Sequence, residues 1–335
     1  MKVCIVGAGG IGGLLAVKFS QAGEAVTVVD RGLHLDAMRS HGLSLKMADG
    51  TESTTTDLRV TGKISQAGST DLIILAVKAH QIADVAADLS PLYGSDTSVL
   101  TVQNGIPWWY FQRHGGELDS KRLQKLDPEG LIAQHIPAER ILGCVAYPAC
   151  ELAAPGMIRH MEGNRFPVGE LDGCVTERAT TAANLFNNAG LKSYVIDDIR
   201  AEIWLKAWGA LCFNPISALT NATMVDICQH DETRKLVINM MTEAQTIAEK
   251  LGIAFRRTIE ERVAGAEAVG AHKTSMLQDS LAGRPMEVDA VIGAVTELGR
   301  ITQSSCPTID SIYACVSLLN NKVQQLGVEQ PNKSD

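Results

Sequence analysis

The sequence predicts two domains, an α/β domain built on a parallel sheet and a second domain made only of helices. Three observations support this fold class. Short apolar strands alternate with helix-length segments through the first half of the chain. A glycine-rich turn follows the first strand, and from Ile199 onward the long segments have helical periodicity. We therefore divide the 335 residues into a first domain at 1–197, a second at 198–328 and a polar tail at 329–335.

The first strand, residues 3–6, runs directly into Gly7-Ala8-Gly9-Gly10-Ile11-Gly12, the pattern G-x-G-x-x-G. In a dinucleotide-binding turn the first glycine permits the tight turn, the second lets the backbone approach a pyrophosphate, and the third lets the next helix pack on the strand. A helix follows from Leu14 and stops near Gly23, and its N-terminus offers N–H groups to phosphates. We predict that these six residues bind a dinucleotide in a Rossmann unit; the alternative is a doubly wound domain with an empty turn.

The second strand, residues 25–29, ends at Asp30 and Arg31, where a Rossmann unit meets the adenosine ribose of its cofactor. An acidic residue at this point suits the free ribose of NAD, whereas a nearby arginine suits the 2′-phosphate of NADP. The residues alone leave both cofactors open.

Two further strands, residues 71–77 and 98–102, end at Lys78 and at Gln103-Asn104-Gly105, with a helix expected between them at 80–89. In open α/β sheets ligands bind beyond the carboxyl ends of the strands, so Lys78 and Asn104 are predicted to lie at that edge. The remaining elements of the first domain are expected to be strands at 140–143, 157–160 and 192–196 and a helix at 176–188.

Residues 106–138 break this rhythm and are predicted to form an insertion or a long loop over the sheet. The segment contains the adjacent residues Trp108 and Trp109. They are expected either to cap an apolar substrate or to form a small core beneath the loop.

The second domain is predicted to contain helices at residues 200–219, 231–251, 257–281, 285–303 and 307–322. In the first of these, Trp204 and Trp208 are one turn apart and should pack into the core. Lys206 lies on a different face, and Asn214 returns close to that face eight residues later. From spacing alone, a solvated lysine and an asparagine that merely precedes Pro215 are the favoured explanation over a functional role.

Composition excludes several classes of function. The net charge of −8 and the absence of a Lys/Arg run argue against nucleic-acid binding. No apolar run reaches the ~18 residues of a membrane span, and a strand that begins at residue 3 leaves no room for a signal peptide. The eight cysteines form no C-x-x-C pair, so we expect no metal site and a reducing, cytoplasmic location.

Several motifs occur in one order along the whole chain: G-A-G-G-I-G-G, V-K-A, Q-N-G, R-A-E-I-W-x-K-x8-P, T-S-M-L-Q-D and G-R-P-M-E-V-D. Together they resemble the ketopantoate reductase (2-dehydropantoate 2-reductase) family of pantothenate biosynthesis. The resemblance implies NADP-dependent reduction of a 2-keto acid, ketopantoate, to pantoate in a cleft between the two domains. It implies that Lys206 donates the proton to the ketone oxygen, and that Glu287 is the acidic site residue that meets the substrate hydroxyl or the cofactor.

The same resemblance assigns roles to further residues. Asn214 and Ser275 correspond to polar residues that hold the substrate. Asn104 and Lys78 correspond to residues beside the nicotinamide and the phosphates. Ala149 falls where the backbone passes along the cofactor.

Two positions depart from the family pattern. Ala210 stands where the family commonly has an asparagine, so one substrate hydrogen bond is missing. Asp30 directly precedes Arg31, which keeps NAD open although NADP is favoured. The alternatives are therefore a reductase of another branched or aromatic 2-keto acid, and a non-catalytic dinucleotide-sensing protein, against which the retained Lys206 and Glu287 speak. The helical domain is a candidate homodimer surface.

Overall fold

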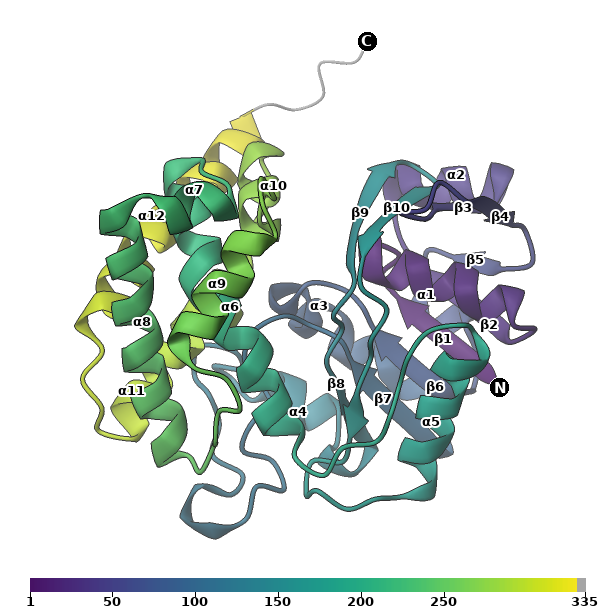
Figure 1. The fold of residues 1–335 in the computed structure, drawn as a ribbon. Coiled ribbons are helices and arrows are strands. Elements are labelled where there is room, and N and C mark those ends of the chain that lie inside the picture. Colours follow the sequence, from purple (N-terminus) through teal and green to yellow (C-terminus); the bar gives the residue numbers. More distant parts are fainter. Residues whose placement is uncertain (330–335) are drawn as a thin grey trace. The chain divides into compact units, whose positions relative to one another are not determined.

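The computed structural model describes residues 1–329, and the chain forms two compact units (Figure 1). The first unit comprises Met1–Gln103, Trp108–Arg122 and Asp127–Ile199. The second comprises Asn104–Pro107, Leu123–Leu126 and the chain from Arg200 onward. Two short pieces of the long loop therefore belong to the second, helical unit. The predicted polar tail at 329–335 lies outside the described residues except for Glu329, which ends the last helix.

The first unit contains a seven-stranded sheet with the order β11-β8-β7-β6-β1-β2-β5, in which every neighbouring pair is parallel except β11 and β8. The strands are β1 (Lys2–Val6), β2 (Ala25–Val29), β5 (Arg59–Thr61), β6 (Thr70–Leu75), β7 (Tyr93–Thr101), β8 (Ile141–Cys144) and β11 (Val168–Gly169). In β1 and β6 the last four residues are all buried, as expected where both faces of a parallel sheet are covered. The predicted parallel α/β architecture is confirmed.

A second sheet of four strands was not expected from the sequence. Its order is β4 (Glu52–Thr55), β3 (Leu43–Lys46), β10 (Met157–Glu162) and β9 (Ala149–Ala154). Helix α1 (Gly10–Gln21) contacts strands of both sheets, which explains why it is buried on almost every side (Figure 1). Only β10 was anticipated, because β3 and β4 are only four residues long, β4 is polar, and β3 pairs with a strand far away in sequence.

The other helices of this unit are α2 (Gly32–His41), α3 (Ile82–Ala86), α4 (Leu131–His135) and α5 (Glu177–Asn188). Two local predictions are wrong here. The helix expected at 80–89 is split into α3 and two 3₁₀ segments, Ala79–Gln81 and Ala87–Leu92; Pro91 disfavours α-helical backbone in the residue before it. The strand expected at 192–196 makes only isolated bridges, because the strand beside it, β11, is two residues long.

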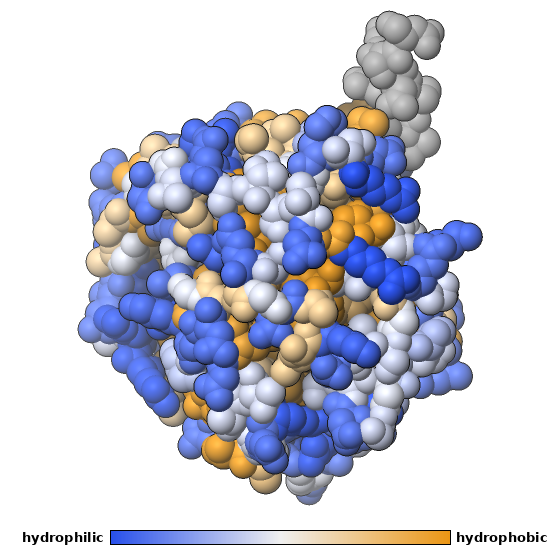
Figure 2. Space-filling view, turned by 90° about the vertical axis from the view of Figure 1, so that its right-hand side faces the viewer, coloured by the Kyte–Doolittle hydropathy of each residue, from blue (hydrophilic) through white to orange (hydrophobic). Residues whose placement is uncertain are grey.

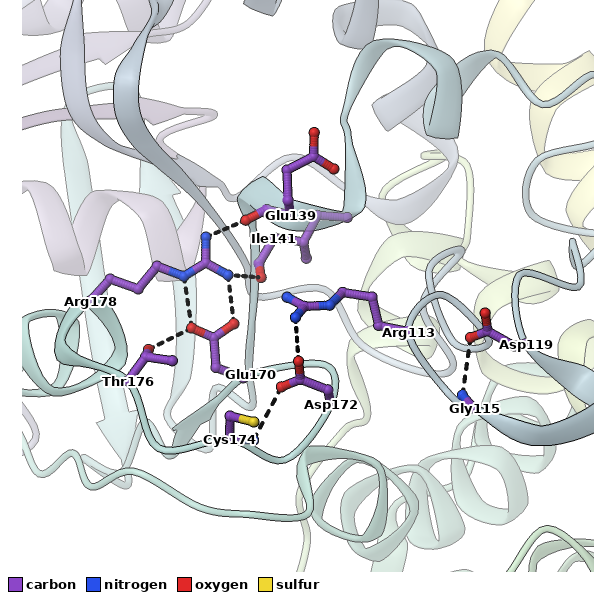
Figure 3. A network of polar contacts seen from close by, with 10 residues as sticks. All are labelled: Arg113, Gly115, Asp119, Glu139, Ile141, Glu170, Asp172, Cys174, Thr176 and Arg178. Atoms are coloured by element: carbon purple, nitrogen blue, oxygen red, sulfur yellow. Dashed lines mark hydrogen bonds and ion pairs between the residues drawn. The ribbon is translucent and has the colours of Figure 1, made fainter.

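A buried carboxylate ties α5 to the large sheet (Figure 3). Glu170 is 1% exposed and accepts hydrogen bonds from Arg178 Nε (2.7 Å), Arg178 Nη2 (2.5 Å) and Thr176 Oγ1 (2.6 Å). Arg178 also donates to the carbonyls of Glu139 and Ile141, at the start of β8. The hydrogen bond to Glu170 raises the pKa of Arg178. Because a buried carboxylate is costly without partners, this network fixes the start of α5 against β8.

Within the described residues, the second unit contains helices and loops and no strand, as the sequence predicts. Its helices are α6 (Ile199–Thr220), α7 (Met224–Gln229), α8 (Asp231–Lys250), α9 (Ile259–Ala268), α10 (Ser275–Leu281), a π-helical segment (Asp289–Gly293), α11 (Ala294–Ile301) and α12 (Pro307–Glu329). The single helix expected at 257–281 is wrong: the chain breaks at Gly270, whose φ is +78°, and Thr274 caps a new helix. The helix expected at 285–303 begins later, with the π-helical segment.

On the face of the molecule in Figure 2, hydrophilic residues predominate and hydrophobic residues form separate patches. Within residues 1–329, no helix is both long and apolar enough to cross a membrane. All eight cysteines are free thiols, and burial raises the pKa of the Cys4 thiol in β1 to about 12. In the same range, no group of three or more His, Cys, Asp or Glu side chains is arranged to hold a metal ion.

Candidate active site

The glycine turn between β1 and α1 is closely packed on one side and open on the other. Gly7 has a φ of +94°, and a Cβ there would lie 2.9 Å from the side chain of Val77. A Cβ on Gly12 would collide with the carbonyl of Gly7. At Gly9, by contrast, a Cβ would meet nothing within 4 Å. The turn therefore has free space at the glycine expected to face a pyrophosphate, next to the N-terminus of α1, and it fits a dinucleotide.

Strand β9 passes directly over the start of α1. The backbone carbonyl of Cys150 lies so near Gly10 that a Cβ on this glycine would collide with it. Ala149, the residue expected to run along the cofactor, is the first residue of β9 and precedes this contact. Burial raises the pKa of the Cys150 thiol to about 12, so the thiol carries no negative charge beside the glycine turn. The cofactor role of Ala149 stays a prediction.

The carboxylate of Asp30 is engaged by backbone N–H groups. Ala8 donates its N–H to Asp30 Oδ2 at 2.6 Å, and Arg31 donates its N–H to Oδ1 at 2.7 Å. Asp30 therefore helps to hold the glycine turn. Arg31 is exposed and forms the N-cap of α2.

Lys78 is half-buried at the carboxyl end of β6, the edge where the sequence places it. It is the N-cap of the 3₁₀ segment Ala79–Gln81, and its N–H donates to the side chain of Gln81 at 3.1 Å. The side-chain amide of Gln103 donates to the carbonyls of Leu75 (2.7 Å) and Val77 (3.0 Å). Gln103 thus fixes the backbone that leads to Lys78, a role that the sequence did not indicate.

In the helical unit, α6 has one buried flank and one half-exposed flank. Trp204 and Trp208 are buried as predicted, and Trp208 donates its indole N–H to the carbonyl of Met241 at 2.9 Å. Lys206, Ala210 and Asn214 are all half-exposed and follow one another at intervals of four residues. Residues at this spacing lie along one face of a helix. The buried tryptophans therefore fix the rotation of α6 and leave Lys206 and Asn214 on its accessible flank.

The two residues after Asn104 contact the backbone of the segment that follows Glu287. Gly105 has a φ of +80°, and a Cβ there would collide with the carbonyl of Ala290. The next residue, Ile106, donates its N–H to the same carbonyl at 2.8 Å. Ala290 belongs to the π-helical segment, a feature that often occurs at functional sites. The residues directly after Asn104 therefore contact the segment that begins shortly after Glu287, and both segments belong to the helical unit.

A series of hydrogen bonds that includes charged side chains lies beside the π-helical segment. Lys125 Nζ donates to the hydroxyl of Tyr313 at 2.7 Å, and Tyr313 donates to Asp289 Oδ1 at 2.8 Å. The hydrogen bond with Tyr313 raises the pKa of Lys125, so the ammonium form is favoured. Glu297 accepts the N–H groups of Gln124 (2.7 Å) and Lys125 (2.9 Å). These contacts hold residues 123–126 against the helices that follow Glu287.

The predicted site residues thus fall into two groups. The first unit contains the glycine turn, Arg31, Lys78 and Ala149, and the helical unit contains Asn104, Lys206, Asn214, Ser275 and Glu287. Ser275 is exposed and is the first residue of α10. The assignment of these residues to cofactor and substrate stays a prediction.

The two tryptophans of the long loop lie in the interior of the protein. Trp108 is 4% exposed and Trp109 is 1% exposed, and Trp109 donates its indole N–H to Thr101 Oγ1 at 3.0 Å. The small core beneath the loop is therefore the correct alternative.

A parallel-sheet unit with an open glycine turn, together with a helical unit that presents a lysine and polar side chains, defines a class of nicotinamide-dinucleotide-dependent oxidoreductases. Two family models match this chain: "Ketopantoate reductase PanE/ApbA" over residues 3–173 and "Ketopantoate reductase PanE/ApbA C terminal" over residues 198–320. The chain belongs to the ketopantoate reductase family and is an NAD(P)-dependent oxidoreductase. The first of these models includes the 106–138 segment.

Individual relatives cover almost the full chain. It is 49% identical over 320 residues to a 2-dehydropantoate 2-reductase from Mesorhizobium japonicum, which spans 95% of this chain and 98% of the relative. A crystal structure of a candidate ketopantoate reductase from Ralstonia solanacearum MolK2 superposes with a TM-score of 0.91 at 38% identity, covering 96% and 98% of the two chains. D-mandelate dehydrogenase, in a ternary structure with NADH and anilino(oxo)acetate, shares the fold with a TM-score of 0.81 at 24% identity, covering 96% and 99%.

Proposed function

We propose that this protein reduces 2-dehydropantoate to pantoate with NADPH, and that Lys206 supplies the proton. The observation that carries the proposal is the position of Lys206 and Asn214 on the half-exposed flank of α6, opposite the buried tryptophans. The 49% identity to a 2-dehydropantoate 2-reductase over 95% of the chain supports the choice of substrate.

The chemistry follows from the charge that develops on the substrate. When bound, the reduced nicotinamide supplies a hydride to the keto carbon. The ketone oxygen then gains negative charge, which the ammonium group of Lys206 stabilises and neutralises by giving up its proton. Asn214 and Ser275 hold the substrate, and Glu287 binds its hydroxyl group or the cofactor. Asn104 and Lys78 hold the nicotinamide and phosphate ends of the cofactor.

The preference for NADPH over NADH rests on the pair Asp30 and Arg31. Both carboxylate oxygens of Asp30 accept a backbone N–H, one from Ala8 and one from Arg31. A carboxylate held in this way contributes to the turn itself. The exposed Arg31 beside it is the group suited to a 2′-phosphate.

A second candidate function is reduction of another branched or aromatic 2-keto acid with NADH. Ala210 supports it, because alanine on the same flank as Lys206 offers no side-chain hydrogen bond to the substrate. The structural likeness to D-mandelate dehydrogenase, whose structure contains NADH, points in the same direction.

One experiment separates these functions: dinucleotide oxidation followed by absorbance, with NADPH and NADH, across a panel of 2-keto acids. The proposal expects the highest kcat/KM for 2-dehydropantoate with NADPH. A higher value for phenylglyoxylate or a branched analogue with NADH would support the second candidate. Tight dinucleotide binding without turnover of any keto acid would identify a dinucleotide-sensing protein and overturn both.

A further inference from the structure

Ala8, between the first two glycines of the turn, is held through both of its backbone polar groups. Its N–H donates to the Asp30 carboxylate at 2.6 Å, and its carbonyl lies 2.9 Å from Nε2 of His34. Asp30 follows β2 and His34 lies in α2, so both partners come from the segment after the second strand. Ala8 is fully buried and His34 is 7% exposed. The bond between His34 and the Ala8 carbonyl is therefore shielded from water, and a hydrogen bond is stronger in such surroundings than in water.

The second nitrogen of His34 determines where its proton lies. The backbone N–H of Gly156 donates to Nδ1 of His34 at 2.9 Å. Nδ1 must therefore be unprotonated, and in a neutral imidazole Nε2 then carries the proton. The Ala8 carbonyl can only accept, which matches this arrangement. His34 thus connects the glycine turn to Gly156, the turn between β9 and β10 of the second sheet.

The bond to Ala8 has a direct consequence for Gly9. The carbonyl of Ala8 and the N–H of Gly9 belong to the same planar peptide group, so fixing the direction of one fixes the direction of the other. Gly9 is also the glycine with open space around it. His34 therefore controls the orientation of the backbone N–H at the open position of the turn.

We propose that His34 is a positioning residue of the dinucleotide site, acting through the Ala8 carbonyl on the N–H of Gly9. This inference rests on the proposed function only in that the turn binds a dinucleotide. His34 lies outside the G-x-G-x-x-G pattern. Ala8, the residue whose carbonyl His34 holds, has only a methyl group as its side chain. A histidine that only fills the core would stabilise the fold, and dinucleotide affinity would not depend on which of its two hydrogen bonds is lost.

Two substitutions separate the two hydrogen bonds of His34. In His34→Gln, the side-chain amide reaches as far as Nε2 and keeps a donor for the Ala8 carbonyl. In His34→Asn, the side-chain oxygen takes the place of Nδ1 and keeps an acceptor for Gly156, while the bond to Ala8 is lost. His41→Asn is the matched control, because His41 is an exposed histidine at the end of the same helix.

The measurement is the Kd for NADPH by fluorescence titration on the full-length protein, together with KM, kcat and the melting temperature. We expect His34→Asn to weaken NADPH binding about three- to tenfold, the effect of one lost hydrogen bond, with kcat at saturating NADPH unchanged. His34→Gln should stay within about twofold of the native Kd. Both should lower the melting temperature, since each loses one buried bond, and His41→Asn should change nothing.

Equal NADPH affinity in both His34 variants, or a greater loss in His34→Gln than in His34→Asn, would overturn this role and leave His34 as a residue of the fold. Failure of the proposed function gives a different result. A native protein that binds NADPH without reducing 2-dehydropantoate would overturn the proposed substrate, while the binding comparison would still decide the role of His34. A native protein that binds neither NADPH nor NADH would overturn both.

Discussion

The glycine turn of the first unit and the Asn104–Gly105 turn of the helical unit are built alike but stabilised differently. Each has a glycine with positive φ, +94° at Gly7 and +80° at Gly105, and neither glycine has room for a Cβ. Gly7 packs on Val77, which follows the neighbouring strand β6. Gly105 packs on the carbonyl of Ala290, in a π-helical segment at the other end of the sequence.

This difference separates two tasks. The first turn is completed by nearby strands and by Asp30 and His34, and it presents backbone N–H groups at an open position. The second turn brings Asn104 next to the segment of Glu287 within the unit that also carries Lys206. We therefore expect changes in the first turn to alter dinucleotide affinity, and changes in the helical unit to alter the rate of the chemical step.

The strongest test of that separation is Lys206→Ala. A positioned general acid contributes about 10²- to 10⁴-fold, so kcat should fall by that factor while the Kd for NADPH stays the same. Steady-state kinetics with 2-dehydropantoate and a separate NADPH titration measure the two effects. Lys235→Ala, which removes an exposed lysine of α8, is the control and should match the native enzyme. A native kcat with a raised KM would reduce Lys206 to a binding group and leave the proton donor unidentified.

Features that depend on a local sequence pattern were predicted, whereas features that depend on contacts between distant residues were not. The glycine pattern, the buried strands and the tryptophan-bearing helix are local patterns, and the structure confirms the α/β unit, the helical unit and the burial of Trp204 and Trp208. The four-stranded sheet was missed because β3 and β4 are only four residues long, because β4 is polar, and because β3 pairs with β10, far along the chain. The contact of Gly105 with Ala290 has no local signal either.

The bonds of Asp30 and His34 to Ala8 were missed for a related reason. The sequence shows an acidic residue where a ribose ligand is expected, but the direction of its carboxylate depends on the finished turn. The break at Gly270 was missed because helical periodicity continues on both sides of it.

Arg31→Ala in the first unit should have the opposite effect to Lys206→Ala, because it should change NADPH affinity and not kcat. Loss of a hydrogen-bonded charge pair with the 2′-phosphate is worth about 1.5–3 kcal/mol, so NADPH should bind about 10- to 150-fold more weakly. NADH affinity and kcat at saturating dinucleotide should hardly change. Arg39→Ala, an exposed arginine later in α2, is the matched control. Tighter native binding of NADH than of NADPH would show that Asp30 sets the preference instead.

The contact that holds the second turn can be tested with two glycines of similar conformation. Gly105→Ala and Gly68→Ala both place a Cβ at positive φ, +80° and +76°, but only Gly105 would meet another group. The backbone strain alone costs about 1–2 kcal/mol, so Gly68→Ala should lose that much in the free energy of unfolding. Gly105→Ala should lose more, because the carbonyl of Ala290 must move, and its kcat should fall as well. Denaturant unfolding and steady-state kinetics measure both; equal losses would mean that the contact with Ala290 yields without cost.

The smallest expected effect concerns Ala210, between Lys206 and Asn214 on the accessible flank of α6. Ala210→Asn restores an amide that can hydrogen-bond a substrate, an interaction worth about 0.5–1.5 kcal/mol. The ratio of kcat/KM for 2-dehydropantoate to kcat/KM for other 2-keto acids should therefore rise about two- to twelvefold. Asparagine is a poorer helix former than alanine by up to about 0.7 kcal/mol, and Ala264→Asn, at an exposed position of α9, measures that cost without touching the proposed substrate residues. A flat or falling ratio in Ala210→Asn, with stability lowered only as in Ala264→Asn, would show that the substrate does not reach this turn of α6. In that case the missing asparagine would say nothing about substrate choice, and selectivity would have to come from residues elsewhere in the helical unit.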